Sequence, residues 1–326
     1  MSLRVHFNQI SFSEFTDEFK SSLDPDIIIT EGKTIPSPAN YEVLVYPTPS
    51  REWLEASSKL KAVVIPWAGI PEKTLELMHQ FPDISLHNIH HNKINTAELG
   101  LGLLLSAAKF IIPFDRALRN NDWTPRYEEP NAIRLQGKTV LILGFGAIGQ
   151  TLGSYCLGLG MRVIATKKHV NKGTYFQDVD IYPDSKLEEL LPYADILLIT
   201  LPLTHETNDL IGESELNSMP QGGILVNIGR GPIVNQYALY DALKNGHLRS
   251  AASDVWYNYP ESRETINKTP PADVPFNELI NFVMSPHRGG MVEGVERQRA
   301  EALAELLNAA SRGLAIPNKV DITAGY

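Results

Sequence analysis

The stretch TVLILGFGAIGQ, residues 139–150, decides how the rest of the chain is interpreted. Its apolar first half predicts a buried strand, and three glycines, Gly144, Gly146 and Gly149, follow with helix-forming residues behind them. Such a turn brings backbone N–H groups and a helix N-terminus up to a diphosphate. Gly144 would close the turn, Gly146 would admit the diphosphate, and Gly149 would let the helix pack on the strand. We therefore predict a dinucleotide site rather than a purely structural turn, and its contacts also include Phe145, Ala147 and Ile148.

Apolar runs of the same kind recur on both sides of this stretch. Six runs rich in Val and Ile between residues 139 and 287 predict a parallel sheet buried on both faces. Five shorter runs in the first hundred residues alternate with helical sequence, and a last helix from Met291 to about Arg312 leads to a predicted edge strand at 315–322. We predict a smaller α/β domain, residues 1–95 with 292–326, interrupted by a dinucleotide-binding domain, residues 96–291, with the ligand in the cleft between them.

The composition limits the classes of partner and location. The chain has 326 residues, 43% of them apolar and 21% charged, which suits two globular domains. Its net charge of −9, from 29 basic and 38 acidic residues, argues against nucleic acid or an anionic membrane as a partner. The longest apolar run, residues 99–108, is too short for a transmembrane span, which needs about 20 residues. A single cysteine, Cys156, and an N-terminus without an apolar signal region predict a reducing, cytoplasmic location.

The residues after the second strand of the larger domain bear on the choice of cofactor. Lys167, Lys168 and His169 stand where such a domain usually has an Asp or Glu that accepts hydrogen bonds from the adenosine ribose. A lysine cannot accept those bonds, but it can bind the additional phosphate of NADP. We therefore predict NADP(H), with NAD(H) as the alternative if these residues form only a solvated basic turn.

Two reactive side chains follow later strands of the same sheet. Arg230 comes after the fourth strand and His287 after the sixth, and the carboxyl ends of parallel strands share one edge. A guanidinium can bind a carboxylate in a bidentate fork, and an imidazole can donate a proton near neutral pH. Reduction of a 2-oxo acid needs a cation for the carboxylate and carbonyl and an acid for the new alkoxide. The pair therefore predicts this reaction.

Five segments between Leu135 and Gly290 resemble the D-2-hydroxyacid dehydrogenase family and come in that family's order. They are LQGKTVLILGFGAIGQ, ADILLITLPLTHETNDLIG, ILVNIGRGPIVNQYALYDALKNGHL, AASDVW and VMSPHRGG. The resemblance implies an α/β fold in which a Rossmann-type doubly wound parallel sheet is inserted into a smaller flavodoxin-like domain. It also implies a homodimer and nicotinamide-dependent reduction of small 2-oxo acids.

The resemblance also assigns roles to residues. It implies that Arg230 anchors the substrate carboxylate, that His287 is the acid/base, and that Asp254 lies near the nicotinamide. Further cofactor contacts are implied at Pro202, Thr207, Ile228, Gly229 and Gly289. In the first domain, IPWAGI and HNIHHNKINTAE resemble the substrate loop and the segment before the hinge helix, which implies substrate contacts at Trp67, Ala68 and Gly69. His91 and Asn92 are further candidates for substrate contacts, and the alternative is a solvated loop, which is usual for consecutive histidines such as His90 and His91. No metal is predicted, because the adjacent histidines have no cysteine or suitably spaced carboxylate beside them.

The chain departs from the family pattern at Tyr259. The family has a glutamate five residues after the aspartate, which pairs with the histidine and keeps it protonated, and DVWYNYPE has Tyr259 at that place. A phenol can hydrogen-bond an imidazole without stabilising its charge, so we expect catalysis by His287 to fade at a lower pH than in members with the glutamate. Glu261 and Glu264 lie nearby in sequence and are the alternative partners for His287, but sequence spacing does not determine whether their carboxylates reach it.

The same departure leaves two other functions open. One is a catalytically weak, NAD(P)-sensing regulator on the same fold, as corepressor relatives of the family are. The other is a dehydrogenase of another small anion such as formate, since formate dehydrogenases also lack this glutamate. Retention of both Arg230 and His287 favours the 2-oxo acid reductase.

Overall fold

The chain folds into two compact α/β units. The structure is a computed structural model that describes residues 2–10, 12–168, 170, 176 and 178–325. One unit comprises Met1–Asn92 and Met291–Tyr326, and the other comprises Lys93–Gly290. Each boundary lies within about three residues of the division expected from the sequence.

The larger unit is built on a seven-stranded sheet whose neighbouring strands are all parallel. The strands are β6 (Thr139–Leu143), β7 (Arg162–Lys167), β8 (Val179–Pro183), β9 (Ile196–Ile199), β10 (Gly223–Asn227), β11 (Leu248–Ser253) and β12 (Phe282–Met284). Their order is β12-β11-β10-β9-β6-β7-β8. Counted from β6, this is the 3-2-1-4-5-6 order of dinucleotide-binding domains with one further strand at the edge, so the predicted Rossmann-type sheet is confirmed.

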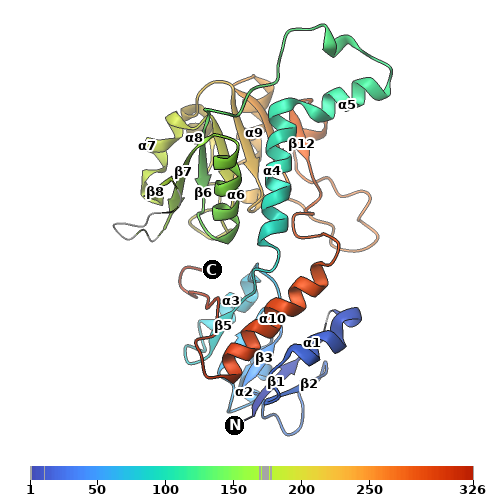
Figure 1. Cartoon of the computed structure of the whole chain (residues 1–326), viewed down its shortest axis with the longest axis vertical. Coiled ribbons are helices and arrows are strands. Elements are labelled where there is room, and N and C mark those ends of the chain that lie inside the picture. Colours follow the sequence, from blue (N-terminus) through green and yellow to red (C-terminus); the bar gives the residue numbers. More distant parts are fainter. Residues whose placement is uncertain (1, 11, 169, 171–175, 177, 326) are drawn as a thin grey trace. The chain divides into compact units, whose positions relative to one another are not determined.

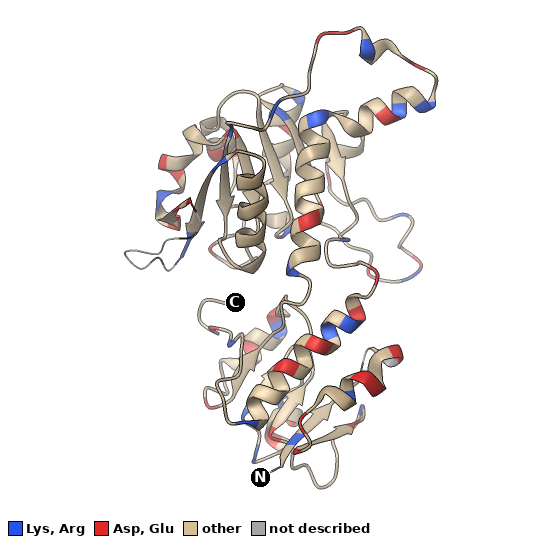
Figure 2. Cartoon of the chain, in the orientation of Figure 1, with Lys and Arg blue, Asp and Glu red and all other residues tan. Residues whose placement is uncertain are grey.

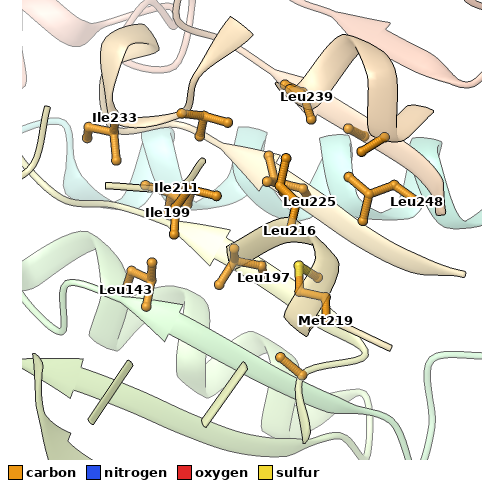
Figure 3. Packing of buried hydrophobic residues seen from close by; sticks show 14 of the residues in the cluster. Leu143, Leu197, Ile199, Ile211, Leu216, Met219, Leu225, Ile233, Leu239 and Leu248 are labelled. Atoms are coloured by element: carbon orange, nitrogen blue, oxygen red, sulfur yellow. The ribbon is translucent and has the colours of Figure 1, made fainter. Parts of the chain in front are cut away.

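Both faces of this sheet are buried, because alternate side chains of its strands enter two different cores. Leu141 and Leu143 of β6 point into one core, and Val140 and Ile142 point into the other. The first core is covered by α7 (Leu187–Leu190), α8 (Glu213–Ser218) and α9 (Gln236–Lys244), and Figure 3 shows leucines of β9 and β10 among those of α8 and α9. The second is covered by α4 (Lys93–Lys109) and α6 (Ala147–Gly158).

Helix α5 (Ile111–Arg119) continues α4 at an angle of 67°. Within the larger unit, α5 and the 3-10 turn η2 (Thr124–Arg126) extend away from the sheet (Figure 1). Large apolar side chains are exposed on this segment, among them Leu118, Trp123 and Tyr127. Among the described helices, none alone combines the length and hydropathy of a membrane span, and α4 with α5 does so only as this bent pair.

The smaller unit contains a five-stranded parallel sheet. Its strands are β1 (Leu3–Phe7), β2 (Ile27–Glu31), β3 (Val43–Val45), β4 (Ala62–Val64) and β5 (Ser85–His87), in the order β2-β1-β3-β4-β5. That is the flavodoxin-like order that was predicted. Helices α1 (Thr16–Ser22) and α10 (Val295–Ser311) pack in one core, and α2 (Arg51–Ala56) and α3 (Glu72–Met78) pack in the other. Acidic and basic residues are interspersed along α10 and over both units (Figure 2).

Two local predictions need correction, and one strand was missed. Residues 315–322 form no strand, and only an isolated bridge joins Lys319 to His87; Pro317 has no N–H to donate to a ladder. The last helix begins at Val295 rather than at Met291. Strand β8 was not predicted, because its sequence VDIYP is mostly exposed and lacks the continuous apolar run of the inner strands.

Candidate functional site

The glycine-rich turn between β6 and α6 has the backbone that only glycine permits. Gly144 has a φ of +90°, and a Cβ at Gly149 would lie 2.2 Å from the carbonyl oxygen of Gly144. These two glycines therefore close the turn and bring α6 against the strand. A Cβ at Gly146, by contrast, would meet no atom within 4 Å, so the space in front of this residue is open.

Three backbone donors face that open space at the start of α6. The N–H groups of Gly146, Ala147 and Ile148 donate no hydrogen bond to any residue that the structure describes. Unpaired N–H groups at a helix N-terminus bind anions, so the turn fits the diphosphate of a dinucleotide. Phe145 differs from the other residues predicted to contact the dinucleotide in that its N–H is already paired. Its ring is buried, and its N–H donates to the carbonyl of Thr166 over 3.0 Å.

The basic residues after β7 form an ion pair with a loop on the other side of β6. Lys167 is the exposed last residue of β7, and Lys168 Nζ pairs with Glu206 Oε2. The bond from Lys168, and then its charge, lower the pKa of the Glu206 carboxyl below its ordinary value. His169 lies outside the described residues. Glu206 was not predicted, because it belongs to the loop after β9, distant in sequence from the lysines.

The loop that carries Glu206 is held by its own hydrogen bonds. The hydroxyl of Thr207 donates to the carbonyl of Pro202 over 2.7 Å and accepts the N–H of Thr204 over 2.8 Å. Pro202 and Thr207, both predicted cofactor contacts, are thus joined directly. Leu203 stands between them and is 43% exposed.

The predicted catalytic residues come together at the carboxyl edge of the sheet. Arg230 follows β10 and its Nη1 donates to the carbonyl of Gly229 over 2.7 Å. Tyr259 Oη and His287 Nδ1 are 2.8 Å apart. The positive charge of Arg230 is close enough to lower the pKa of both Tyr259 and His287. Arginine, phenol and imidazole therefore form one cluster within the larger unit.

The environment of His287 disfavours its charged form. Partial burial lowers the pKa of His287 below its ordinary value, Arg230 lowers it further, and Asp254 acts in the opposite direction. Burial also raises the pKa of Tyr259, so the phenol stays neutral beside the imidazole. Neither Glu261 nor Glu264 makes a described contact with His287, so Tyr259 is the group at Nδ1.

A further hydrogen bond orients the phenol of Tyr259. The backbone N–H of Trp256 donates to Tyr259 Oη over 3.1 Å, which occupies one lone pair of that oxygen. A phenol has one proton to donate and room for two acceptor bonds. Tyr259 can therefore donate to a neutral Nδ1 or accept from a protonated one, and in the neutral case it leaves the proton on Nε2.

Asp254 holds the loop that carries His287. Asp254 is only 2% exposed, and its Oδ1 accepts from the Ser285 hydroxyl over 2.5 Å and from the Arg288 N–H over 2.8 Å. Oδ2 accepts from the N–H of Gly289 over 2.8 Å, and a Cβ at Gly289 would lie 3.0 Å from that oxygen. His287 between these anchors has a φ of +57°, which side-chain-bearing residues seldom adopt. Asp254 thus anchors the loop that carries His287, and its contact with the cofactor stays a prediction.

The other predicted contacts after β10 are largely enclosed. Ile228 is buried, and the N–H of Gly229 donates to the side-chain oxygen of Asn227 over 3.0 Å. A Cβ at Gly229 would lie 2.5 Å from the carbonyl of Leu201. This close backbone approach explains why the position before Arg230 is glycine.

In the smaller unit, the predicted substrate loop has free donors. The N–H groups of Trp67, Ala68 and Gly69 donate no hydrogen bond within the described part of the chain. His91 Nδ1 and Asn92 Oδ1 are buried and likewise have no described partner. Burial, then the charges of Arg299 and His90, lower the pKa of His91 to about 4, so its imidazole is neutral at pH 7. No group of three or more His, Cys, Asp or Glu side chains suited to a metal occurs among the described residues.

Comparison with known proteins is consistent with this arrangement. A D-3-phosphoglycerate dehydrogenase from Methanocaldococcus jannaschii is 29% identical over 274 residues, covering 84% of this chain and 50% of the relative. A glyoxylate reductase from Aeropyrum pernix is 35% identical over 237 residues, covering 69% of this chain and 66% of the relative. The chain thus spans about half the length of the first relative and about two thirds of the second.

A solved structure shares the fold over the whole chain. The D-isomer specific 2-hydroxyacid dehydrogenase from Xanthobacter autotrophicus Py2, in complex with NADPH and MES, matches with a TM-score of 0.81 and 22% identity over 100% of both chains. In sequence, residues 101–289 match the family model described as D-isomer specific 2-hydroxyacid dehydrogenase, NAD binding domain. Because that match covers more than half of its residues, the chain belongs to the D-isomer specific 2-hydroxyacid dehydrogenase family.

Proposed function

We propose that this protein is an NADP(H)-dependent reductase of small 2-oxo acids, with NAD(H) as a weaker cofactor. The observation that carries the proposal is the cluster of Arg230, His287 and Tyr259 on the edge of the sheet where the unpaired N–H groups of α6 lie. The family relatives named glyoxylate reductase, and a structural neighbour that holds NADPH, support the same assignment.

The cofactor fits the residues of the larger unit. Gly146, Ala147 and Ile148 would bind the diphosphate through their free N–H groups, and Lys167 and Lys168 would bind the phosphate on the adenosine ribose. When bound, the reduced nicotinamide supplies a hydride to the carbonyl carbon of the substrate. The protein must supply the remaining requirements, a grip on the carboxylate and a proton for the oxygen.

Arg230 and His287 meet those requirements by charge and by proton transfer. The Arg230 guanidinium would bind the carboxylate and polarise the carbonyl, and its charge stabilises the alkoxide that forms. His287 Nε2 would give its proton to that alkoxide oxygen, and Tyr259 holds the ring through Nδ1 in either protonation state. Because the pKa of His287 is below the ordinary value for histidine, the protonated imidazole that donates the proton is depleted at a lower pH than it would be for an ordinary histidine. In the smaller unit, the free N–H groups of Ala68 and Gly69 would bind an anionic substrate group.

The direct test is NADPH oxidation with glyoxylate, hydroxypyruvate, pyruvate and phenylpyruvate, and reduction of NADP⁺ with D-3-phosphoglycerate and with formate. Turnover of one of the 2-oxo acids is expected, with Arg230→Gln and His287→Gln each lowering kcat/KM about a hundredfold or more while NADPH still binds. Tight NADPH binding without turnover of any of these compounds would favour the regulator. Turnover of formate alone would favour the other alternative.

We also propose that the protein acts as a homodimer. The segment of α5 and η2 exposes Leu118, Trp123 and Tyr127, by 51%, 61% and 82%, while it extends from the larger unit. Apolar side chains gathered on a projecting segment are typical of an association surface. Light scattering on the purified protein should give twice the chain mass, and a monomer at micromolar concentration would refute the proposal.

A further inference from the structure

The ion pair between Lys168 and Glu206 lies where the cofactor's adenosine half is expected. Lys168 follows β7, Glu206 is in the loop after β9, and β6 lies between these two strands in the sheet. The pair therefore spans the carboxyl end of β6, from which the glycine-rich turn begins. A dinucleotide bound at that turn extends its adenosine toward the end of β7.

Glu206 places a carboxylate beside Lys168, whereas the residues at the end of β7 itself are lysines. Its carboxylate is 68% exposed, whereas the Lys168 side chain is 31% exposed, so the lysine is the more fixed partner. The hydrogen bonds among Pro202, Thr204 and Thr207 fix the backbone on both sides of Glu206. The carboxylate is thus held close to the same ammonium group that a ribose phosphate would need.

We propose that Glu206 is a specificity-determining residue that sets the ratio of NADPH to NADH affinity by competing with the 2′-phosphate for Lys168. This inference rests on the proposed function and concerns the same cofactor site. With NADPH, the phosphate replaces the carboxylate as the partner of Lys168, and Glu206 turns into solvent. With NADH no phosphate arrives, and the ion pair persists. Glu206 therefore reduces the preference for NADPH that the two lysines would otherwise give.

The size of the effect follows from the exposure of the pair. An ion pair at the surface contributes little in water, so its loss should change affinity by about two- to fivefold. Repulsion between the carboxylate and the phosphate adds to this change and is screened by salt. The gain in NADPH affinity on removal of Glu206 should consequently shrink when the salt concentration is raised.

The test compares the dissociation constants of NADPH and NADH, measured by fluorescence titration without substrate, in Glu206→Gln and a matched control. The control is Glu189→Gln, which removes the same charge from an exposed ion pair with Lys186 in the same unit. Glu206→Gln should bind NADPH about two- to fivefold more tightly and NADH unchanged, while Glu189→Gln should leave the ratio as in the wild type. In a Lys168→Gln background, Glu206→Gln should have a smaller effect on NADPH.

The outcomes separate this inference from the proposed function. If neither cofactor binds the wild-type protein, both the function and the inference fail. If NADPH binds and supports turnover but Glu206→Gln leaves the ratio as Glu189→Gln does, only the inference fails. An equal gain in affinity for NADPH and NADH in Glu206→Gln would also overturn the inference, because the effect would then come from the overall charge of the protein and not from competition with the 2′-phosphate.

Discussion

Replacing Tyr259 should shift the pH range in which the protein reduces its substrate. Tyr259 Oη lies 2.8 Å from His287 Nδ1, so a carboxylate introduced by Tyr259→Glu would stand beside the imidazolium. Two unit charges about 4 Å apart attract by about 1 kcal/mol in water and about 4 kcal/mol at an effective dielectric of 20. Because Tyr259 is 45% exposed, the lower half of that range applies. At about 1.4 kcal/mol per pKa unit, the pKa of His287 should rise by roughly 1 to 2 units.

The sign of the shift determines the expected profile. A raised pKa keeps His287 protonated to higher pH, so the alkaline limb of kcat/KM for reduction should move upward by the same amount in Tyr259→Glu. Tyr259→Phe removes the hydrogen bond to Nδ1 and leaves the Trp256 N–H without its acceptor. We expect about a fivefold lower kcat/KM in that variant, equivalent to one net hydrogen bond of about 1 kcal/mol.

The assay is NADPH oxidation measured from pH 5 to pH 9 with a 2-oxo acid below its KM. Tyr193→Glu serves as the control, because Tyr193 is 68% exposed in the same unit and receives the same charge away from His287. An alkaline limb that stays in place in Tyr259→Glu, or that moves equally in Tyr193→Glu, would show that Tyr259 is not the effective partner of His287.

Two further changes test the supports of the site. Asp254→Ala removes the acceptor of Ser285, Arg288 and Gly289, and it should lower the free energy of unfolding by about 3 kcal/mol in urea titrations; unchanged stability would contradict the anchoring role. The pKa of His91 is about 4 in the folded protein, below its unfolded value of 6.5. The contribution of its neutral imidazole to the free energy of unfolding is therefore complete above pH 6.5 and is lost as the pH falls toward 4. Between pH 7.5 and pH 5 the wild type should therefore lose about 2 kcal/mol more than His91→Gln; equal losses in the two proteins would refute this.

The continuous strands were predictable because burial on both faces leaves little choice of residue. Ile196–Ile199 and Gly223–Asn227 are buried at every position, and such runs are visible in a sequence. Strand β8 was missed for the opposite reason, since its side chains are mostly exposed and only pairing with β7 makes it a strand. The edge strand predicted at 315–322 has apolar residues but no ladder.

Within the site, the sequence indicated residues but not their partners. Arg230 and His287 could be named because each follows a predicted strand, and Tyr259 could be named because it stands where the family has a glutamate. The bonds of Asp254 reach residues 31 to 35 positions later, and the bond from Lys168 reaches a residue 38 positions later. Such contacts depend on which strands are neighbours in the sheet, and the spacing of residues along the chain does not contain that information.

The left-handed backbone at His287 has a consequence for how this site can change. The left-handed conformation costs a residue with a side chain about 1–2 kcal/mol of conformational free energy. At His287 this cost is offset by the hydrogen bonds that the backbone N–H groups of Arg288 and Gly289 donate to the Asp254 carboxylate. Weakening of those bonds would let the peptide relax to an ordinary negative φ and swing the ring out of alignment. A variant changed only at Asp254 would thus stay folded and still bind its dinucleotide, but it would no longer reduce its substrate.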